Sequence, residues 1–582
     1  MTPLVLCLLV AVQADGADDA STYEDGQLAA VLEREGLAPF APDDDDRVTF
    51  LRIVGHDVFT PDDFWPDWLN LVHVRTAEDV IARELLFTVG GPFERLDESA
   101  RNLRAMFVFA LVRVTPVRKR SDGTVGVLVF ARDLWSLRLE QGFQITGASV
   151  DRLMVQLTER NLFGRAKVAT VRFALDPSSW SLGEIAYDPR VWGGALEAGE
   201  RIELYLSRFD SRFDGAAGRV IVGMPLNDVR QPWGVAVDAA IEARTHRNVV
   251  DGAILPWDAP DTVTAERVPQ VWGERNVAVE AMVRRQFTRW PAPWLVHRLA
   301  LGVGFVDDDA EPIAETALPP ELHDAFARDV LPPVRRTLFP FLDYQAFTTD
   351  HRVYEDLDTF GVSEPVRLGP SLAVTMGAGS RAALSSSDTV FAAGAVAIAA
   401  DPWDGLVEAA AEGSARLEDG VVKNRTLSLR LRMASAPTLA GRVAWRVDTT
   451  MRRNDETNTL VTLGGDTGLR GYGSGAFFDV GASVAQSTLE WRSLPIDLAS
   501  VQLGLACFYD AGGIFHEPAD LALHHDVGVG VRFLFPQFNR GVYRLDVAVP
   551  LDELGLRVLM TFGDTQVVEH GRAAFDRLVP RR

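Results

Sequence analysis

The sequence predicts a mainly β protein: a transmembrane antiparallel β-barrel of about 16 strands, preceded by a small α+β domain. Three observations predict this fold. After Glu140 the helical periodicity disappears, and segments of about ten residues alternate apolar and polar side chains almost to the end of the chain. The polar faces of these segments carry charges of both signs, as suits a wet lumen. Tryptophans lie near the expected strand ends, where aromatic girdles form: Trp180, Trp192, Trp233, Trp257, Trp272, Trp290 and Trp294.

The chain begins with a short apolar run, Leu4–Val12, which cannot span a bilayer. Val12 and Ala14 are small enough for a signal-peptidase site. We therefore expect residues 1–14 to be a secretory signal peptide, with a buried first strand or helix as the alternative. Residues 15–46 are acidic and end in APDDDD, which predicts a solvated linker.

Residues 47–140 have the pattern of a separate α+β domain. RVTFLRIVG predicts a strand, and AEDVIARELLF together with the segment from Leu96 to Phe107 predicts two helices. Two further strands follow, joined by a turn at Ser121-Asp122-Gly123. The expected order is strand, helix, helix, strand, strand. An aromatic-rich insertion, residues 57–75, has no place in this pattern.

Residues 141–565 form the expected barrel, and residues 566–582 form a polar C-terminal tail. In LSLRLRM (residues 427–433) the leucines fall on one face of a strand and the arginines on the other. A soluble β-sandwich also alternates in this way. The mixed charges and the placement of the tryptophans favour a barrel in lipid, where an antiparallel sheet has to close.

Composition excludes several functions. The net charge of −23 argues against nucleic acid as a partner. Of the two cysteines, Cys7 lies in the expected signal peptide, so no internal disulfide is expected in the mature chain. The sequence has no phosphate-binding loop and no metalloprotease motif, and Ser474 lacks the spacing of a nucleophile elbow. We expect no cofactor and no enzyme activity; a lumen enzyme, such as a phospholipase or protease, is the minor alternative.

Three motifs carry a family resemblance. LRGY (Leu469–Tyr472), TLEWRS with Glu490 and FYDAGGIF with Asp510 follow one another in the order of the BamA/TamA superfamily of outer-membrane barrels, which this chain resembles. ERNLFGRAKV (159–168) is similar to the opening barrel strands of that family, and residues 47–140 resemble one POTRA module. The resemblance implies a bacterial surface antigen type of protein in the outer membrane of a Gram-negative cell, with its N-terminal domain in the periplasm.

Members of that family fold the loop that bears this motif into the barrel lumen, where its arginine contacts carboxylates. The strand pattern agrees. Because Leu489 and Trp491 share the apolar face, Glu490 points to the other face, and Asp510 likewise lies opposite the apolar face. An arginine offers a planar fork for bidentate pairing with carboxylates. We expect Leu469, Arg470, Gly471 and Tyr472 to form the loop motif, with Arg470 pairing with Glu490 and Asp510.

The resemblance implies a barrel that assists insertion or translocation of polypeptides into or across the outer membrane. Its partners would be outer-membrane lipid, an unfolded or secreted client polypeptide, and periplasmic chaperones or accessory proteins. Strands near 143–150 and 556–562 would form its closing seam. Three alternatives stay open: a passive channel or lipid-handling barrel without assembly activity, a structural surface antigen, and an Arg470 that only holds the loop and the shape of the barrel. Further inward charges, at Arg532, Arg544, Asp546 and Arg557, are expected to serve lumen hydration.

Overall fold

The computed structural model divides the chain into two compact units, Met1–Leu134 and Trp135–Arg582. The expected signal peptide and C-terminal tail lie outside the described residues, as does part of the 57–75 insertion. The structure describes residues 19–58, 67–106, 108–146, 149–226, 231–250, 252–258, 267–288, 294–316, 318–354, 356–357, 364–465, 468–498, 501–534, 542–552 and 557–562.

The N-terminal unit is the predicted small α+β domain. Its four strands form a sheet in the order β1-β3-β4-β2, in which β2 pairs parallel to β4 and the other neighbours are antiparallel. The predicted sequence of strand, two helices and two strands is confirmed as β2, α2, α3, β3 and β4. Its elements are α1 (Asp19–Arg34), β1 (Leu37–Pro39), β2 (Leu51–His56), η1 (Asp67–Val72), α2 (Glu78–Arg83), α3 (Leu96–Ala105), β3 (Phe109–Lys119) and β4 (Val125–Asp133).

The predicted linker at residues 15–46 is wrong for its larger described part. Residues 19–39 form α1 and β1, which belong to the N-terminal domain, whereas residues 41–45 are exposed between β1 and β2. Val31 and Leu32 of α1 and Leu37 of β1 are buried against Val117 and Phe130 of the sheet. The partly buried Leu28 lies three and four residues before Val31 and Leu32, so the three residues share one helix face, while Glu33 is exposed. The high content of acidic residues concealed this stripe.

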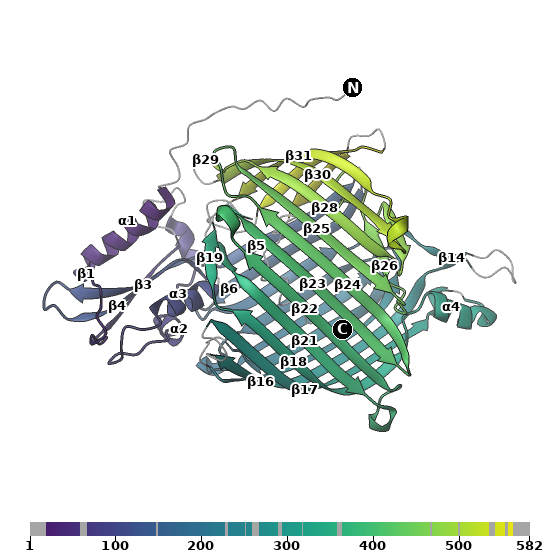
Figure 1. Cartoon of the computed structure of the whole chain (residues 1–582), viewed down its shortest axis with the longest axis horizontal. Helices are drawn as coiled ribbons and strands as arrows, with labels where there is room; N and C mark the ends of the chain where they lie inside the picture. Colours follow the sequence, from purple (N-terminus) through teal and green to yellow (C-terminus); the bar gives the residue numbers. More distant parts are fainter. Residues whose placement is uncertain are drawn as a thin grey trace. The chain divides into compact units, whose positions relative to one another are not determined.

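The second unit is a closed antiparallel barrel, so the predicted fold class is confirmed (Figure 1). Both β28 and β29 pair with β30 and share one position in the ring. In chain order the barrel strands are β5 (Leu137–Thr146), β6 (Ser149–Leu162), β7 (Lys167–Leu175), β8 (Ser179–Asp188), β9 (Glu197–Ser207), β10 (Phe213–Met224), β11 (Trp233–Arg247), β16 (Val271–Thr288), β17 (Leu295–Pro312), β18 (Arg335–Thr348), β21 (Gly369–Gly379), β22 (Thr389–Ala400), β23 (Leu406–Glu418), β24 (Val421–Ala434), β25 (Arg442–Arg453), β28 (Ser483–Arg492), β29 (Ile496–Leu498), β30 (Val501–Phe515), β31 (His524–Leu534), β32 (Tyr543–Pro550) and β33 (Arg557–Phe562).

The barrel has more strands than the roughly 16 expected from its length. Within the described residues the ring contains 21 strand segments. Many connections are short turns; β23 and β24, for example, are separated only by Asp419 and Gly420. Residues allotted to long outer loops therefore lie in strands instead.

The barrel closes where its first and last strands meet. β33 pairs antiparallel with β5 through three residue pairs, from Met560↔Ile145 to Phe562↔Phe143. The next ladder, between β5 and β6, contains ten residue pairs. The closing seam therefore lies within the two expected segments, although the first of them, 143–150, spans the end of β5 and the start of β6. The seam is the shorter of the two ladders that β5 makes.

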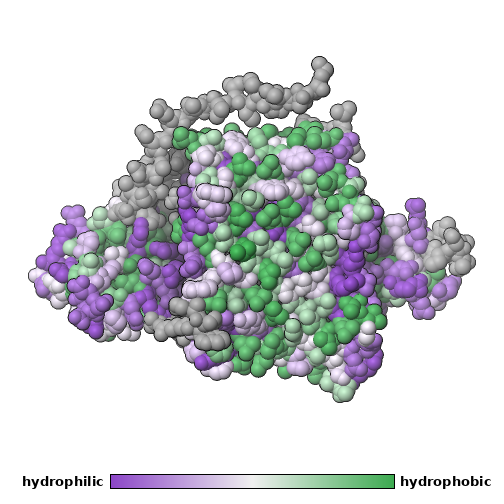
Figure 2. All heavy atoms as spheres, viewed as in Figure 1, coloured by the Kyte–Doolittle hydropathy of each residue, from purple (hydrophilic) through white to green (hydrophobic). Residues whose placement is uncertain are grey.

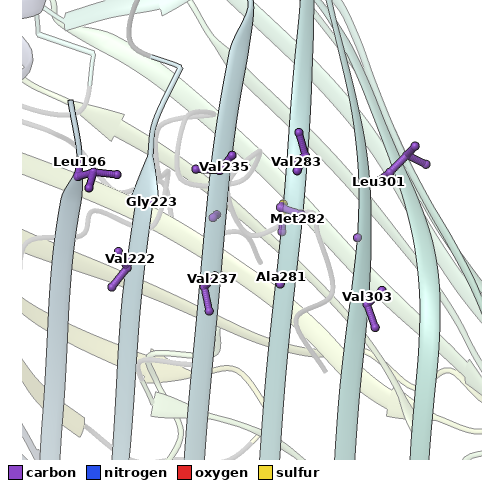
Figure 3. Close-up of a pocket in the computed structure, with 12 residues that line it drawn as sticks. Leu196, Val222, Gly223, Val235, Val237, Ala281, Met282, Val283, Leu301 and Val303 are labelled. Atoms are coloured by element: carbon purple, nitrogen blue, oxygen red, sulfur yellow. The ribbon is translucent and has the colours of Figure 1, made fainter.

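The outer wall of the barrel is apolar. On β24, Leu427 and Leu429 are exposed, whereas Arg432, on the opposite face, is buried. Residues coloured green or white, which are hydrophobic or of intermediate hydropathy, dominate the barrel face in Figure 2. A shallow depression of about 570 Å³ lies in this wall, between β9 and β17. Figure 3 shows the residues that line it. At its centre the small Ala281 lies in register between Val237 and Val303. No helix within the described residues is long and apolar enough to cross a membrane.

Only part of the expected tryptophan girdle is present. Trp180, Trp233 and Trp294 are exposed at or next to strand ends, and Trp192 is exposed in a turn. Trp257 and Trp272 are instead buried together with Phe326 of α4. This cluster joins the connection after β11, with β12 (Val249–Val250), β13 (Ala253–Ile254), β14 (Pro256–Asp258) and β15 (Arg267–Pro269), to the connection after β17, with η3 (Ala314–Thr316), η4 (Pro320–Leu322) and α4 (His323–Asp329). Trp290 lies outside the described residues.

Because the strands alternate in direction, the two ends of the barrel differ. The end where β5 begins is here called the entry end. The connections after β11, β17 and β25 all leave from the opposite end, here called the loop end. The connection between β18 and β21, with β19 (His351–Tyr354) and β20 (Glu364–Arg367), belongs to the entry end.

Candidate functional site

The loop between β25 and β28 carries the LRGY motif into the barrel. Its first and last parts pair as the hairpin β26 (Leu460–Leu463) and β27 (Phe477–Val480). Between them, Leu469 is fully buried and packs with Leu463 and Tyr472. Arg470 is only 3% exposed. Residues 466–467 lie outside the described part of the loop.

Arg470 contacts carboxylates on three strands. Its Nε donates to Oδ2 of Asp510 at 2.7 Å and its Nη2 to Oδ1 of the same residue at 2.9 Å, which is a bidentate pair. Its Nη1 donates to Oε2 of Glu490 at 3.0 Å and to Oδ2 of Asp546 at 3.1 Å. The structure thus brings Arg470, Glu490 and Asp510 together and adds Asp546 from β32.

The same site contains further buried cations. Arg532 donates to Oε2 of Glu490 at 3.1 Å and to Asp546, and Arg492 donates to Oε1 of Glu490 at 2.8 Å. Arg470, Arg492 and Arg532 therefore face Glu490, Asp510 and Asp546. We call these six residues the buried ion cluster. Isolated buried charges are costly, and opposite charges with shared hydrogen bonds offset that cost.

A flat aromatic surface lies beneath the arginine. The guanidinium carbon of Arg470 lies 3.3 Å from the centroid of the Phe508 ring. That ring covers Gly528 on the neighbouring strand, where an added Cβ would lie 2.2 Å from Cζ of Phe508. A cation over an aromatic face is stabilised by the ring quadrupole. Gly528 thus lets Phe508 lie flat beneath Arg470.

The two residues after Arg470 fix the loop at the loop end. The amide of Gly471 donates to Oδ2 of Asp526 at 3.0 Å. The hydroxyl of Tyr472 donates to Oδ2 of Asp552 at 2.9 Å, and Nδ1 of His524 lies 2.9 Å from the same oxygen. Asp552 lies in the turn that leads to β33, so Tyr472 connects the loop to the turn before the closing strand.

Sequence reasoning missed half of this cluster. Arg532 and Asp546, expected to serve lumen hydration, are fully buried and paired with each other. Arg544 is also buried, and the side chain of Arg557 lies outside the described residues. The alternation along each strand shows that these residues point inward. Which inward residues lie at the same height in the barrel depends on the strand register, which the alternation does not give. Arg492 had the clearest signal, since it lies two residues after Glu490 on the same face.

Removing the hydroxyl of Tyr472 tests its contribution to loop anchoring. In Tyr472→Phe the ring keeps its contacts with Phe477 and His524, 5.1 Å and 6.0 Å between centroids, and only the hydrogen bonds are lost. We expect loop opening to become easier by about 1 kcal/mol. Hydrogen exchange of the amides in residues 468–477 should then quicken about five-fold. Equal exchange in both proteins would contradict the anchoring role.

The contribution of Asp552 to holding the loop in place should depend on pH. Hydrogen bonds from His524 and Tyr472 hold the pKa of Asp552 below its usual value. A carboxylate with a depressed pKa contributes stability above its unfolded pKa and loses it as the pH falls through the folded pKa. Wild type should therefore protect the loop better than Asp552→Asn from about pH 8 to pH 5, and this advantage should disappear once the pH falls below the depressed pKa of Asp552. A difference that persists at the lowest pH would contradict this assignment.

Comparison with known proteins gives structural neighbours only. No described protein family and no curated protein matches the chain. The chain is similar to BamA from Haemophilus ducreyi lacking POTRA domains 1-3, at 10% identity and TM-score 0.36, covering 95% of each chain. It is similar to CdiB from Acinetobacter baumannii at 11% identity and TM-score 0.40, covering 94% of this chain and 82% of that one. The corresponding values for CdiB from Escherichia coli are 10%, 0.38, 94% and 85%.

Proposed function

We propose that this protein is an outer-membrane barrel that assists insertion or translocation of polypeptides into or across the outer membrane, without a cofactor and without enzyme activity. The observation that carries the proposal is the loop around Arg470. It is buried inside a closed barrel and tied, through Tyr472 and Asp552, to the turn before the closing strand. A loop in this position can hold the barrel closed until a client engages.

The short seam supports this reading. Three residue pairs join β33 to β5. Opening so few pairs exposes the edges of two strands, and an exposed edge is a template for pairing with another chain. A client strand could pair there by strand addition.

The N-terminal domain supplies a second edge. β2 is an edge strand of its sheet, and at the other edge β1 covers only three residues of β3. Edge strands recognise extended peptides through main-chain hydrogen bonds, which need no particular sequence. We infer that this domain, POTRA-like and placed in the periplasm, captures unfolded clients or accessory proteins.

Reconstitution tests the proposal. The purified protein in liposomes should accelerate the folding of an unfolded outer-membrane protein. Deleting residues 19–134 should abolish the acceleration, because the capturing edge is removed. Single-channel conductance is recorded in parallel, with protein-free liposomes as the control. Steady conductance without any effect on client folding would contradict the proposal and favour a passive channel.

A further inference from the structure

The connection between β18 and β21 forms a second loop inside the barrel, at the entry end. Its strands β19 and β20 pair as a hairpin. Tyr354, Leu357 and Val366 of this connection are buried in one cluster with Leu406 and Ala434. Leu406 and Ala434 pair with each other at the entry end of β23 and β24. They share their face with Glu408 and the buried Arg432, which form an ion pair at 2.8 Å, so the hairpin packs on the lumen side of the wall.

Polar contacts attach the hairpin to the neighbouring turn at the entry end. Arg352 donates to Oδ2 of Asp401 and to Oδ1 of Asp404, each at 2.5 Å. The hydroxyl of Tyr354 donates to the carbonyl oxygen of Gly405 at 3.2 Å. These acceptors belong to the turn between β22 and β23, so the base of the hairpin is fixed on that side.

Leu357, in the connection between β19 and β20, makes a contact much further round the barrel. The carbonyl oxygen of Leu357 accepts a hydrogen bond from Nη1 of Arg492 at 2.7 Å. Arg492 lies on β28, six positions round the ring from β18. Through Leu357, the connection that begins at β18 therefore contacts the inner wall as far round as β28.

One carboxylate joins the two inward loops. Oε1 of Glu490 accepts from Arg492, which holds the hairpin, at 2.8 Å. Oε2 of Glu490 accepts from Arg470, which belongs to the loop from the opposite end, at 3.0 Å. Glu490 and both arginines are nearly fully buried. Moving either loop therefore leaves the other facing a buried, partly unpaired charge.

We propose that the β19–β20 hairpin is a second plug of the lumen, at the entry end, and that Arg492 and Glu490 couple it to the Arg470 loop. Release of either plug then loosens the other. This inference goes beyond the proposed function, because it concerns the lumen itself and holds equally for an insertase and for a channel. Coupling between two sites is reciprocal, so each loop should affect the other by the same factor.

Trypsin reports on the loop end, since it can cut after Arg470 only when that loop leaves the lumen. The full chain is reconstituted in liposomes, and cleavage is followed by fragment mass. Releasing the hairpin with Arg352→Ala and Tyr354→Ala should speed this cleavage about five-fold or more. In an Arg492→Gln background the same release should add nothing further. Arg430→Gln, which alters another inward arginine paired with Asp448, is the matched control and should leave the coupling intact.

The reciprocal experiment uses the reactivity of a thiol in the hairpin to report whether the hairpin leaves the wall. Val366→Cys is introduced with Cys7 and Cys507 replaced by alanine, and maleimide labelling is timed. Arg470→Ala should speed labelling by a similar factor, again only while Arg492 is present. Heat-modifiable gel migration verifies folding, and Tyr354→Phe replaces any hairpin variant that does not fold. Unchanged cleavage after hairpin release, or coupling of equal size without Arg492, would overturn the proposal.

Discussion

Replacing Arg470 by alanine is expected to release the loop from the lumen. The substitution leaves Asp510 without its bidentate partner and removes one of the cations that neutralise Glu490 and Asp546. All three carboxylates are fully buried. Breaking a buried ion pair by removing one partner costs about 3 kcal/mol or more. Hydrogen exchange of the amides in residues 468–477 should therefore accelerate by about two orders of magnitude.

Neutralising the carboxylates that pair with Arg470 should also release the loop. Glu490→Gln combined with Asp510→Asn removes two negative charges that face Arg470, so the loop should again exchange faster. Arg430→Ala is the control, because this inward arginine is 42% exposed and pairs with Asp448 outside the buried ion cluster. Slow exchange in both Arg470→Ala and the carboxylate variant would show that the cluster does not hold the loop.

Gly528→Ala is expected to disturb the loop from the wall side. An added Cβ would lie 2.2 Å from Cζ of Phe508 and 2.5 Å from the carbonyl oxygen of Val547. The ring must lift from the wall, and the guanidinium above it must shift away from its carboxylates. Overpacking of this kind costs about 1–3 kcal/mol, so loop exchange should accelerate by about ten-fold.

A glycine elsewhere in the barrel provides the comparison. On β22, an added Cβ at Gly394 would approach no atom of another strand closer than 3.7 Å. Gly394→Ala should therefore leave both loop exchange and thermal stability close to wild type. If the two alanine variants behaved alike, Phe508 would have no role in seating Arg470.

Strand periodicity predicted the barrel and the inward direction of Glu490 and Asp510, since alternation along a strand is a local property. It did not predict the number of strands, which depends on how the residues are divided between strands and connections. Asp546 and Arg532 could not be assigned to the site because only the register of β28, β30, β31 and β32 brings them to Arg470 and Glu490. In α1, acidic composition concealed a buried stripe formed by Val31 and Leu32.

A purely structural role for Arg470 would leave the loop seated throughout a transport cycle. The proposed function requires the loop to move, because its contacts fix the turn before the closing strand through Tyr472 and Asp552. The two roles make opposite predictions for a loop that is locked in place.

The most direct test locks the loop with a disulfide between Gly471→Cys and Asp526→Cys. An added Cβ at Gly471 would lie 2.6 Å from Cβ of Asp526, so a small shift reaches the spacing of about 3.8 Å that a disulfide requires. The bond should form in the folded barrel, stop the acceleration of client folding, and release it again on reduction. Failure of the bond to form in a folded barrel would contradict the seated loop. Full acceleration of client folding by the cross-linked protein would contradict the proposal that the loop has to move.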